Sequence, residues 1–286
     1  VKQPSYDYRI SVRRIGQLLA GWDFIPGLVA RDFSLAPARS VVDGTDDHFP
    51  ESGPVILLAH GYLGSRFDLS NLAESLAAEG FTCLAAEYPE SLAASYDRIE
   101  GLDRAVINDA LLGCLESKLN IRSKKFGIIG HSLGCGTALR TGDGTWARVC
   151  IAGFPRQRDG SVVPGNVLFI SSMNDGAVSP ARFGGAQGYP KDISLLDQDS
   201  VLDSTLRLPS RAAILYDKPD APNHISFLSE SVNDAMIDFL SGLLPVAKAF
   251  SIPLLDFDRY QTSRDSKKTA EMVHPLVVKY MKQEMM

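Results

Sequence analysis

The stretch "FGIIGHSLGCGTALR", residues 126–140, places a serine between two glycines where an apolar run gives way to small residues. Phe126–Ile129 is apolar enough for a buried strand, and Leu133–Arg140 is predicted as a helix. The pattern G-x-S-x-G at a strand-to-helix junction is typical of a nucleophile elbow. Such a turn lifts the hydroxyl of Ser132 above the sheet edge, at the N-terminus of the helix. We therefore predict that Ser132 is a nucleophile and not only a turn residue.

Short apolar strands alternate with amphipathic helices on both sides of this stretch. Further strands are predicted at Val55–Ala59, Phe81–Ala86, Val149–Ala152, Val167–Ser171 and Ala212–Tyr216. Helices are predicted at Leu69–Ala77, Leu102–Leu115 and Ser229–Leu243, where apolar residues recur at helical spacing. Alternation of this kind predicts the α/β class, with a mostly parallel, doubly wound sheet and helices on both faces.

The pattern predicts a single domain over residues 1–286, with an N-terminal edge segment (1–53), a core (54–245) and a C-terminal segment (246–286). In the first segment, "YRISVRRI" and "ARDFSLA" are expected to add edge strands to the same sheet. Residues 176–210 are expected to form a cap or site-lining insertion, with one helix near 202–206. The stretch "SRDSKKTAEMVHPLVVKYMKQ" predicts a capped helix with a solvated basic face, and the last three residues are expected to fray.

The composition excludes several classes of protein. The chain has 286 residues, 45% hydrophobic and 22% charged, and a net charge of −5, which disfavours a nucleic-acid binder. No apolar run reaches the roughly 18–20 residues of a membrane span. Four cysteines lack CxxC spacing, so we expect buried thiols and no zinc site: Cys83, Cys114, Cys135 and Cys150. The chain begins with valine and lacks an N-x-[ST] sequon, so we expect a processed form in an organelle such as the chloroplast, or in the cytoplasm, ahead of a secreted one.

A serine nucleophile needs a base, and one of the five histidines has the right position. His224, in "DAPNHISFLSE", follows the last strand and so reaches the same sheet edge as the serine. His131 lies inside the elbow with its side chain directed away from the serine, and His60 and His48 belong to a strand end and a polar turn. We therefore predict His224 as the base, with His274 as the rival.

The base needs an orienting carboxylate. "LFISSMNDG" ends a predicted strand and delivers Asp175 at the sheet edge, between the serine and His224 in chain order. An Asn-Asp-Gly turn also occurs without any catalytic role. We predict Asp175 as the acid, and Asp217, Asp199 and Asp203 remain as alternatives.

An oxyanion hole is also required. "LLAHGYLGS" places Gly61 and Tyr62 directly after the first buried strand. The backbone N–H groups of Tyr62 and Leu133 are therefore predicted to hold the oxyanion together. For the substrate pocket we expect Arg66, Phe67, Tyr88 and Tyr96, which follow the strands next to this loop.

These elements occur in the order oxyanion loop, nucleophile, acid and histidine, and in this order residues 54–245 resemble the α/β-hydrolase superfamily. The stretch "PVILLAHGYLGSRFDLSNLAESLAAEGFTCLAAEY", residues 54–88, is also similar to platelet-activating-factor acetylhydrolases and chlorophyllases. Leu133 stands where plant chlorophyllases have arginine. The resemblance implies a serine hydrolase of lipophilic carboxylic esters, without a metal or organic cofactor.

Within that implied function, a chlorophyllase-like activity is the first expectation and a lipase or phospholipid esterase of the acetylhydrolase type is the second. A hydrolase fold kept as a binding module is an alternative of another class. Dehalogenation is disfavoured because such enzymes normally carry aspartate in place of the serine. The only partner expected is a small lipophilic ester. Peripheral membrane contact through "RRIGQLLAGWDFIPGLVA", residues 13–30, is an option beside simple packing on the core.

Overall fold

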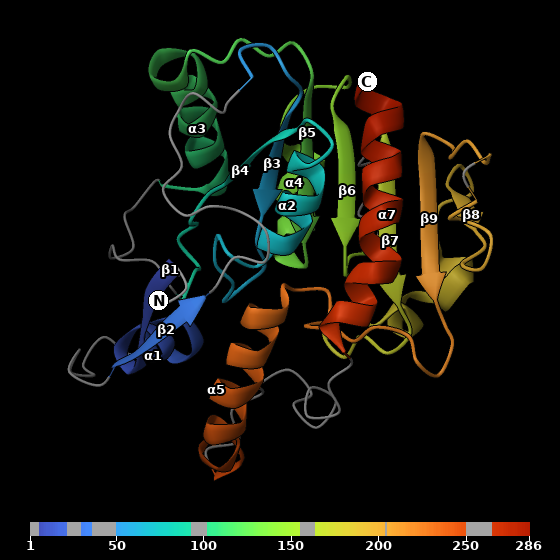
Figure 1. Ribbon diagram of the computed structural model, residues 1–286. Helices are drawn as coiled ribbons and strands as arrows, with labels where there is room; N and C mark the ends of the chain where they lie inside the picture. The colour runs from blue at the N-terminus through green and yellow to red at the C-terminus, as the bar shows by residue number, and fades with distance from the viewer. Residues whose placement is uncertain are drawn as a thin grey trace, which may run out of the picture.

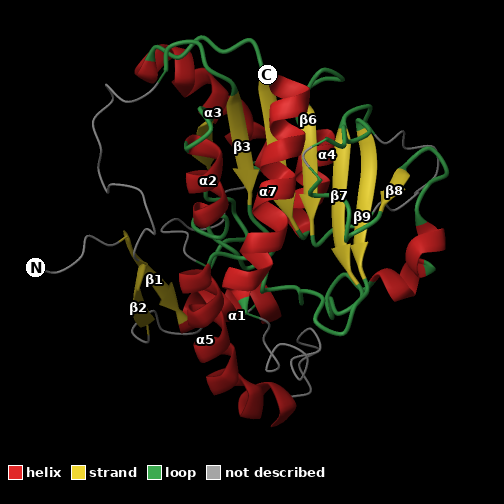
Figure 2. Cartoon of the chain, turned by 45° about the vertical axis from the view of Figure 1, so that its right-hand side comes forward, coloured by secondary structure: helices red, strands yellow, loops and turns green. Residues whose placement is uncertain are grey.

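Seven strands form one parallel sheet at the centre of the computed structural model, which describes residues 6–21, 30–35, 50–92, 102–154, 164–203, 205–249 and 265–286 (Figures 1 and 2). The strands are β3 Val55–Ala59, β4 Thr82–Ala85, β5 Phe126–His131, β6 Ala147–Ile151, β7 Val167–Ser172, β8 Ser194–Leu196 and β9 Arg211–Tyr216. Their order is β4-β3-β5-β6-β7-β9-β8, and every neighbouring pair is parallel. The predicted α/β class with a mostly parallel, doubly wound sheet is confirmed.

Helices cover both faces of the sheet (Figure 1). Alternate residues of a strand point to opposite faces, so an apolar strand supplies two cores. Ile56 and Leu58 of β3 belong to the core on one face of the sheet, and Leu57 and Ala59 belong to the core on the other face. Two helices cover each of these cores. The first pair of helices is α2 Ser70–Ala77 and α7 Ser266–Met285, and the second is α3 Arg104–Leu119 and α4 Leu133–Arg140.

The direction of winding reverses at β3, because the chain places β4 on one side of β3 and β5 on the other. The carboxyl ends of β3 and β5 are therefore neighbours, with Ala59 opposite Gly130 in the register. In open parallel sheets the ligand crevice lies at such a switch point, outside the carboxyl ends of the strands. The topology thus brings the residues that follow Ala59 next to Ser132.

The N-terminal segment forms a separate small sheet. β1 Tyr6–Ser11 pairs antiparallel with β2 Ala30–Leu35, and α1 Val12–Ala20 lies between them in the chain. The prediction that these strands join the main sheet is wrong, because they satisfy each other's backbone groups. The end of "YRISVRRI" is helical, since apolar residues from Val12 onward recur at helical spacing. This two-stranded sheet lies beyond the carboxyl ends of the main strands (Figure 1). Trp22 and the apolar residues of 22–29 lie outside the described residues.

The segment 176–210 adds regular structure to the sheet edge. It contains two short 3-10 helices, Pro180–Phe183 and Gly185–Gly188, and then β8, which pairs with β9. The helix predicted near 202–206 is absent from the described residues there: Val201 donates to the Asp197 carbonyl, and Asp203 accepts from Thr205 in a turn. Aspartate side chains of this kind favour turns over helix. The apolar residues Leu202 and Leu206 are exposed as a result.

The C-terminal helices cover more of the core than the sequence suggests. α5 spans Glu230–Ala249, and α7 is capped by Asp265, which accepts hydrogen bonds from Lys267 and Lys268 as predicted. The prediction that Met285 frays is wrong, because its side chain is buried in the core against Gly127. Among the described residues no helix is both long and apolar enough to cross a membrane.

The cysteines are all free thiols, but not all are buried. Cys135 and Cys150 lie in the core, and Cys83 is half-buried. The prediction is wrong for Cys114, which is exposed on α3 because it lies outside the apolar face that packs on the sheet.

Two glycine substitutions test how the elbow constrains the fold. A Cβ on Gly130 would collide with the main chain of Gly134, whereas a Cβ on Gly113 in α3 would meet nothing within 4 Å. We expect Gly130→Ala to lower the free energy of unfolding by about 2–3 kcal/mol through overpacking. Gly113→Ala should raise it by about 0.5–1 kcal/mol, because alanine favours helix. Urea unfolding measures both, and equal stability of the two variants would contradict this account.

Candidate active site

Ser132 stands on a strained turn between β5 and α4. Its φ is 54° and its ψ is −116°, a backbone conformation that costs a non-glycine residue about 1–3 kcal/mol. The turn is held by the Ser132 N–H, which donates to the Ile151 carbonyl of β6 at 2.9 Å. A Cβ on Gly134 would collide with the main chain of Ala59, so α4 passes directly against the end of β3. The structure therefore places Ser132 at the elbow position that the sequence predicts.

Asp175 and His224 form a buried hydrogen-bonded pair. The Oδ2 atom of Asp175 lies 2.8 Å from the Nδ1 atom of His224, and its Oδ1 atom accepts from the N–H groups of Ala177 (2.8 Å) and Val178 (2.7 Å). Burial would raise the pKa of Asp175, but the neighbouring His224 ring and these hydrogen bonds hold it below its usual value. The carboxylate is thus charged and fixed against the ring.

His131 joins the loop of His224 to the elbow. Its Nε2–H donates to the His224 carbonyl at 3.0 Å, and the two ring centroids are 4.8 Å apart. Burial, and then the proximity of His224, lower the pKa of His131 to about 3, so the ring is neutral. Its Nδ1 atom has no hydrogen-bond partner among the described residues. Because His131 precedes Ser132, this contact brings His224 to the side of the sheet where Ser132 lies.

The loop after β3 lies against the elbow. A Cβ on Gly61 would lie 3.1 Å from the Cβ of Ser132. In the described part of the chain, neither the Tyr62 N–H nor the Leu133 N–H donates to a main-chain carbonyl. Leu133 opens α4, where a backbone N–H has no intrahelical acceptor. The two amides predicted for the oxyanion hole therefore flank Ser132.

The rival residues are engaged elsewhere. His274 lies on α7, and its Nδ1 atom is 3.2 Å from the Ser75 hydroxyl of α2. Asp217 accepts a hydrogen bond from Gln198. Asp199 pairs with Lys218, and Asp203 accepts a hydrogen bond from Thr205. The structure thus brings only His224 and Asp175 to each other among these candidates, and His48 lies outside the described residues.

The predicted pocket residues take different positions. Tyr88 is fully buried, its hydroxyl donates to Asn108, and it does not line the cavity described below. Arg66 pairs with Glu87 at 2.7 Å and its guanidinium lies over the ring of Phe67. Neither Arg66 nor Phe67 lines that cavity, and Tyr96 lies outside the described residues.

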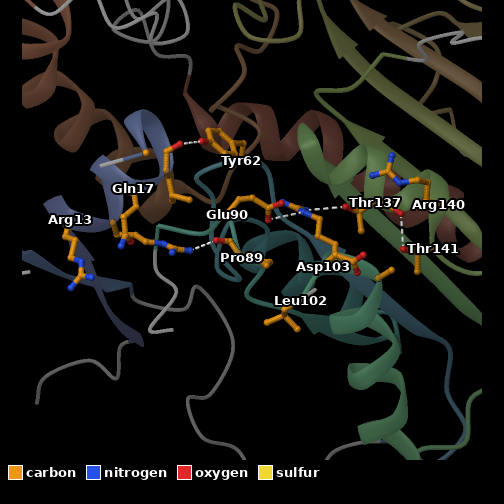
Figure 3. Close-up of a pocket in the computed structure, with 15 residues that line it drawn as sticks. Arg13, Gln17, Tyr62, Pro89, Glu90, Leu102, Asp103, Thr137, Arg140 and Thr141 are labelled. Carbon is orange, nitrogen blue, oxygen red and sulfur yellow. Dashed lines mark hydrogen bonds and ion pairs between the residues drawn. The ribbon is translucent and has the colours of Figure 1, made fainter. Parts of the chain in front are cut away.

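A cavity of about 830 Å³ lies beside the loop after β3, between α1, α3 and α4 (Figure 3). Tyr62 lines it, and its hydroxyl donates to the Leu18 carbonyl of α1. Pro89 and Glu90, which follow the expected pocket residue Tyr88, are part of the wall. Four arginines also line it, Arg13, Arg14, Arg104 and Arg140, against two carboxylates, Glu90 and Asp103. His224 and Asp175 do not line this cavity.

Arg104 and Arg140 were missed by the sequence reasoning, which singled out Arg13 and Arg14 only as part of a stretch for membrane contact. Arg104 opens α3, where the helix dipole disfavours a cation, and this misfit is the signal that could have singled it out. Arg140 ends α4, where a cation is ordinary, so the sequence held no signal for it. No group of three or more metal-ligating side chains is found within the described ranges.

Comparison with known proteins adds little to this geometry. No family model matches the sequence, and no curated protein is similar enough to count as a relative. A putative alpha/beta hydrolase from Agrobacterium tumefaciens is 14% identical, covers 71% of this chain and 89% of its own, and has a TM-score of 0.43.

Two other solved structures are similar to about the same degree. A serine hydrolase without lid from Xanthomonas campestris is 15% identical over 89% of this chain and 97% of its own, with a TM-score of 0.39. An esterase from Pyrococcus furiosus is 15% identical over 62% of this chain and 76% of its own, with a TM-score of 0.39. At TM-scores below 0.5, these likenesses carry no conclusion about what the chain does.

The structure predicts that His60 and His131 stay neutral down to about pH 4. Burial lowers the pKa of each ring to about 3, whereas the unfolded chain takes up each proton near pH 6.5. Each ring's contribution to stability is therefore complete above pH 6.5 and is lost toward pH 3, by about 1.4 kcal/mol per pH unit.

Histidine-selective NMR titration is the appropriate measurement for this prediction. Burial raises the pKa of Asp68 to about 7, so the stability that this carboxyl contributes falls as the pH rises. In a measurement of overall stability against pH, this change would offset the contribution of the two histidines. A charged state of His60 or His131 detected above pH 5 would contradict the predicted burial.

Proposed function

We propose that the chain is a serine hydrolase that cleaves carboxylic esters through an acyl-enzyme. The observation that carries the proposal is the buried Asp175–His224 hydrogen bond of 2.8 Å, on a loop that His131 ties to the Ser132 elbow. With Nδ1 of His224 bonded to Asp175, Nε2 is the ring nitrogen that would act on the serine hydroxyl. This is the order of groups that a serine–histidine–aspartate triad requires.

The reaction proceeds in two halves. His224 accepts the proton of Ser132 as the Oγ atom attacks the ester carbonyl, and a tetrahedral oxyanion forms. Asp175 keeps the imidazole in the required tautomer and stabilises its positive form. His224 then gives the proton to the departing alcohol, which leaves an acyl-enzyme. Water repeats the cycle, releasing the acid and restoring Ser132.

The oxyanion is held by two backbone donors, the N–H groups of Tyr62 and Leu133. A single donor of this kind is typically worth about 2.7–4 kcal/mol of transition-state stabilisation. Because Leu133 begins α4, the positive end of the helix dipole adds to the stabilisation. Both donors are peptide groups, so neither has a side-chain rotamer of its own.

For the substrate, a lipophilic ester is the first candidate, with chlorophyll ahead of a phospholipid of the platelet-activating-factor type. Tyr62 and Leu133 flank Ser132, and their side chains are 44% and 42% exposed. Large exposed apolar side chains beside a nucleophile suit an apolar acyl or alcohol group. A hydrolase fold that binds such a ligand without turning it over is the alternative from another class.

An ester that carries a carboxylate or phosphate is the second candidate. The guanidinium of Arg140 folds back along α4, so a Cβ on Gly136 would lie 3.3 Å from it. Within the described residues Arg140 has no ion pair with a carboxylate, although it lines the cavity beside Tyr62. A cavity lined by four arginines and two carboxylates attracts anions even in a chain with a net charge of −5.

A fluorophosphonate probe tests the nucleophile and its base. The probe should label the native protein and fail to label Ser132→Ala, because only an activated hydroxyl attacks phosphorus. His224→Ala should lower kcat at least about 10³-fold, whereas His274→Ala, on the far helix α7, should leave it within twofold. Labelling that survives Ser132→Ala would show that Ser132 is not the nucleophile. If His274→Ala lost turnover and His224→Ala kept it, the assignment of the base would be wrong.

A substrate panel decides between the candidate esters. Chlorophyll, platelet-activating factor and p-nitrophenyl palmitate represent the lipophilic class, with p-nitrophenyl butyrate as the short reference. For the acidic class, p-nitrophenyl hydrogen glutarate is compared with its methyl ester. A lipophilic site predicts that the long esters have the higher kcat/KM.

An acidic-ester site instead predicts at least a tenfold preference for the free glutarate, abolished by Arg140→Gln. The control Arg122→Gln removes an exposed arginine that does not line the cavity. If the protein hydrolyses only the short neutral esters, p-nitrophenyl butyrate and the methyl ester of the glutarate, both proposed substrate classes would be wrong. Tight binding of one ligand without turnover would favour the binding module.

A further inference from the structure

We propose that Arg104 is a positioning residue that fixes the peptide between Gly61 and Tyr62, so that its N–H group faces the oxyanion. This inference rests on the proposed function, because it assigns a task to the same site. Arg104 comes from α3 and does not touch the Asp175–His224 pair. It reaches the loop after β3 through the carbonyl groups of His60 and Gly61.

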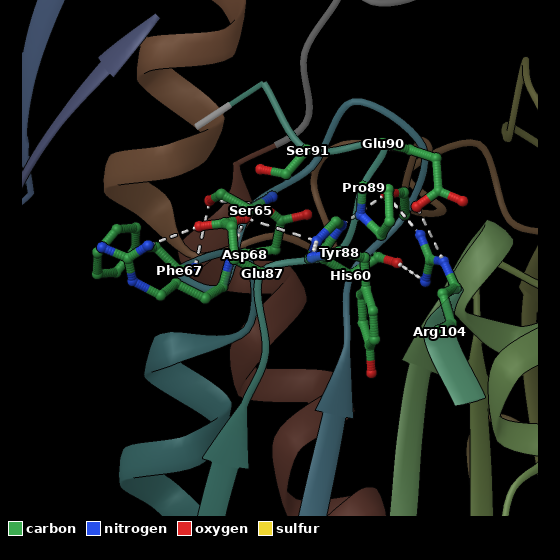
Figure 4. A network of polar contacts seen from close by, with 12 residues as sticks. His60, Ser65, Phe67, Asp68, Glu87, Tyr88, Pro89, Glu90, Ser91 and Arg104 are labelled. Carbon is green, nitrogen blue, oxygen red and sulfur yellow. Dashed lines mark hydrogen bonds and ion pairs between the residues drawn. The ribbon is translucent and has the colours of Figure 1, made fainter. Parts of the chain in front are cut away.

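The carbonyl oxygen of Gly61 accepts hydrogen bonds from three donors. His60 Nδ1 lies 2.7 Å from it, the Gly64 N–H 3.3 Å and the Arg104 Nη2 atom 3.4 Å. Arg104 also donates from Nη1 to the His60 carbonyl at 2.8 Å (Figure 4). Two successive carbonyls of the loop are therefore held by one guanidinium.

Peptide geometry converts this anchoring into an orientation of the amide. The described residues contain no cis peptide bond, and in a trans peptide the C=O and N–H groups point in opposite directions. When the Gly61 carbonyl faces Arg104 and His60, the Tyr62 N–H must face away from them. Since Gly61 lies against Ser132, that N–H is directed to the serine's side of the loop.

His60 can donate to Gly61 only in one tautomer, and a second contact selects it. The Tyr88 N–H donates to His60 Nε2 at 3.0 Å, so this nitrogen carries no proton and Nδ1 carries it. Burial lowers the pKa of His60 to about 3, which keeps the ring neutral. His60 and Arg104 thus act on one carbonyl with fixed protonation states.

Arg104 is itself held in place from several directions. Its Nε atom pairs with Glu90 at 3.3 Å, its Nη1 atom lies 3.3 Å from the Thr137 hydroxyl, and its guanidinium is 4.3 Å from the centre of the Tyr88 ring. A planar guanidinium can make these contacts at once, whereas a lysine ammonium presents a single point. The conservative substitution is therefore not equivalent here.

The charge of Arg104 also acts through the peptide. A cation at the oxygen end of a peptide polarises it and makes the N–H at the other end a stronger donor. The peptide then offers the oxyanion a hydrogen bond that is both oriented and strengthened. An interaction of this kind matters only when the oxyanion forms, so it affects kcat and leaves substrate binding nearly unchanged.

A second buried arginine provides a matched control. Arg148 donates to four main-chain carbonyls, those of Ala138, Thr141, Asp143 and Trp146, all remote from the loop after β3. Arg148→Lys and Arg104→Lys therefore remove the same chemistry from two buried networks, and only one of them holds the oxyanion loop.

The experiment compares these two variants on an ester that the native protein hydrolyses. Arg104→Lys should lower kcat about 10–100-fold, and KM should stay within threefold of the native value. This loss of kcat should not exceed the loss that follows removal of a whole oxyanion donor. The Ki of a trifluoromethyl ketone, which forms a tetrahedral oxyanion on the serine, should rise by the same factor as kcat/KM falls. Arg148→Lys should keep kcat and this Ki within twofold of the native values, even if its melting temperature falls as far as that of Arg104→Lys.

Amide hydrogen exchange gives a readout that needs no turnover. In Arg104→Lys the amides of residues 61–64 should exchange faster than in the native protein. In Arg148→Lys the same amides should exchange at the native rate. Unchanged exchange and kcat in Arg104→Lys, or equal losses of kcat in both variants, would overturn the proposal. Failure of the proposed function would instead appear as a native protein that the fluorophosphonate does not label.

Discussion

The close approach of α4 to the strand ends is the constraint on which the rest of the site depends. Gly134 lies against the main chain of Ala59, and Gly130 lies against Gly134, so neither position has room for a side chain. This contact forces the turn at Ser132 into its positive φ and joins the carboxyl ends of β3 and β5. The serine and the amide of Leu133 are consequently placed by main-chain packing.

Charge around the elbow is arranged so that one carboxylate is kept ionised and two nearby imidazoles are kept neutral. Asp175 is buried but receives two backbone N–H groups and the His224 ring, which offset the cost of burying its charge. His131 and His60 are buried as neutral rings, each with one donated hydrogen bond that orients a neighbouring carbonyl. The positive charge that forms during the proposed reaction is therefore confined to His224.

Much of this arrangement could be predicted from the sequence, because buried strands and amphipathic helices leave local patterns. Helix Leu133–Arg140 was predicted to the residue, and the pairing of Asp175 with His224 followed from their places at strand ends. Pairing partners are not local, which is why the separate sheet of β1 and β2 and the edge strand β8 were missed. The burial of Met285 and the reach of Arg104 depend on tertiary contacts that no periodicity reveals.

Trapping of the acyl-enzyme tests the central claim most directly. The native protein is mixed with a turned-over p-nitrophenyl ester, quenched in acid within milliseconds and examined by intact and peptide mass spectrometry. The account predicts one added acyl mass, located on Ser132 and absent after the substrate is exhausted. Turnover without any covalent adduct, or an adduct on a different residue, would contradict it.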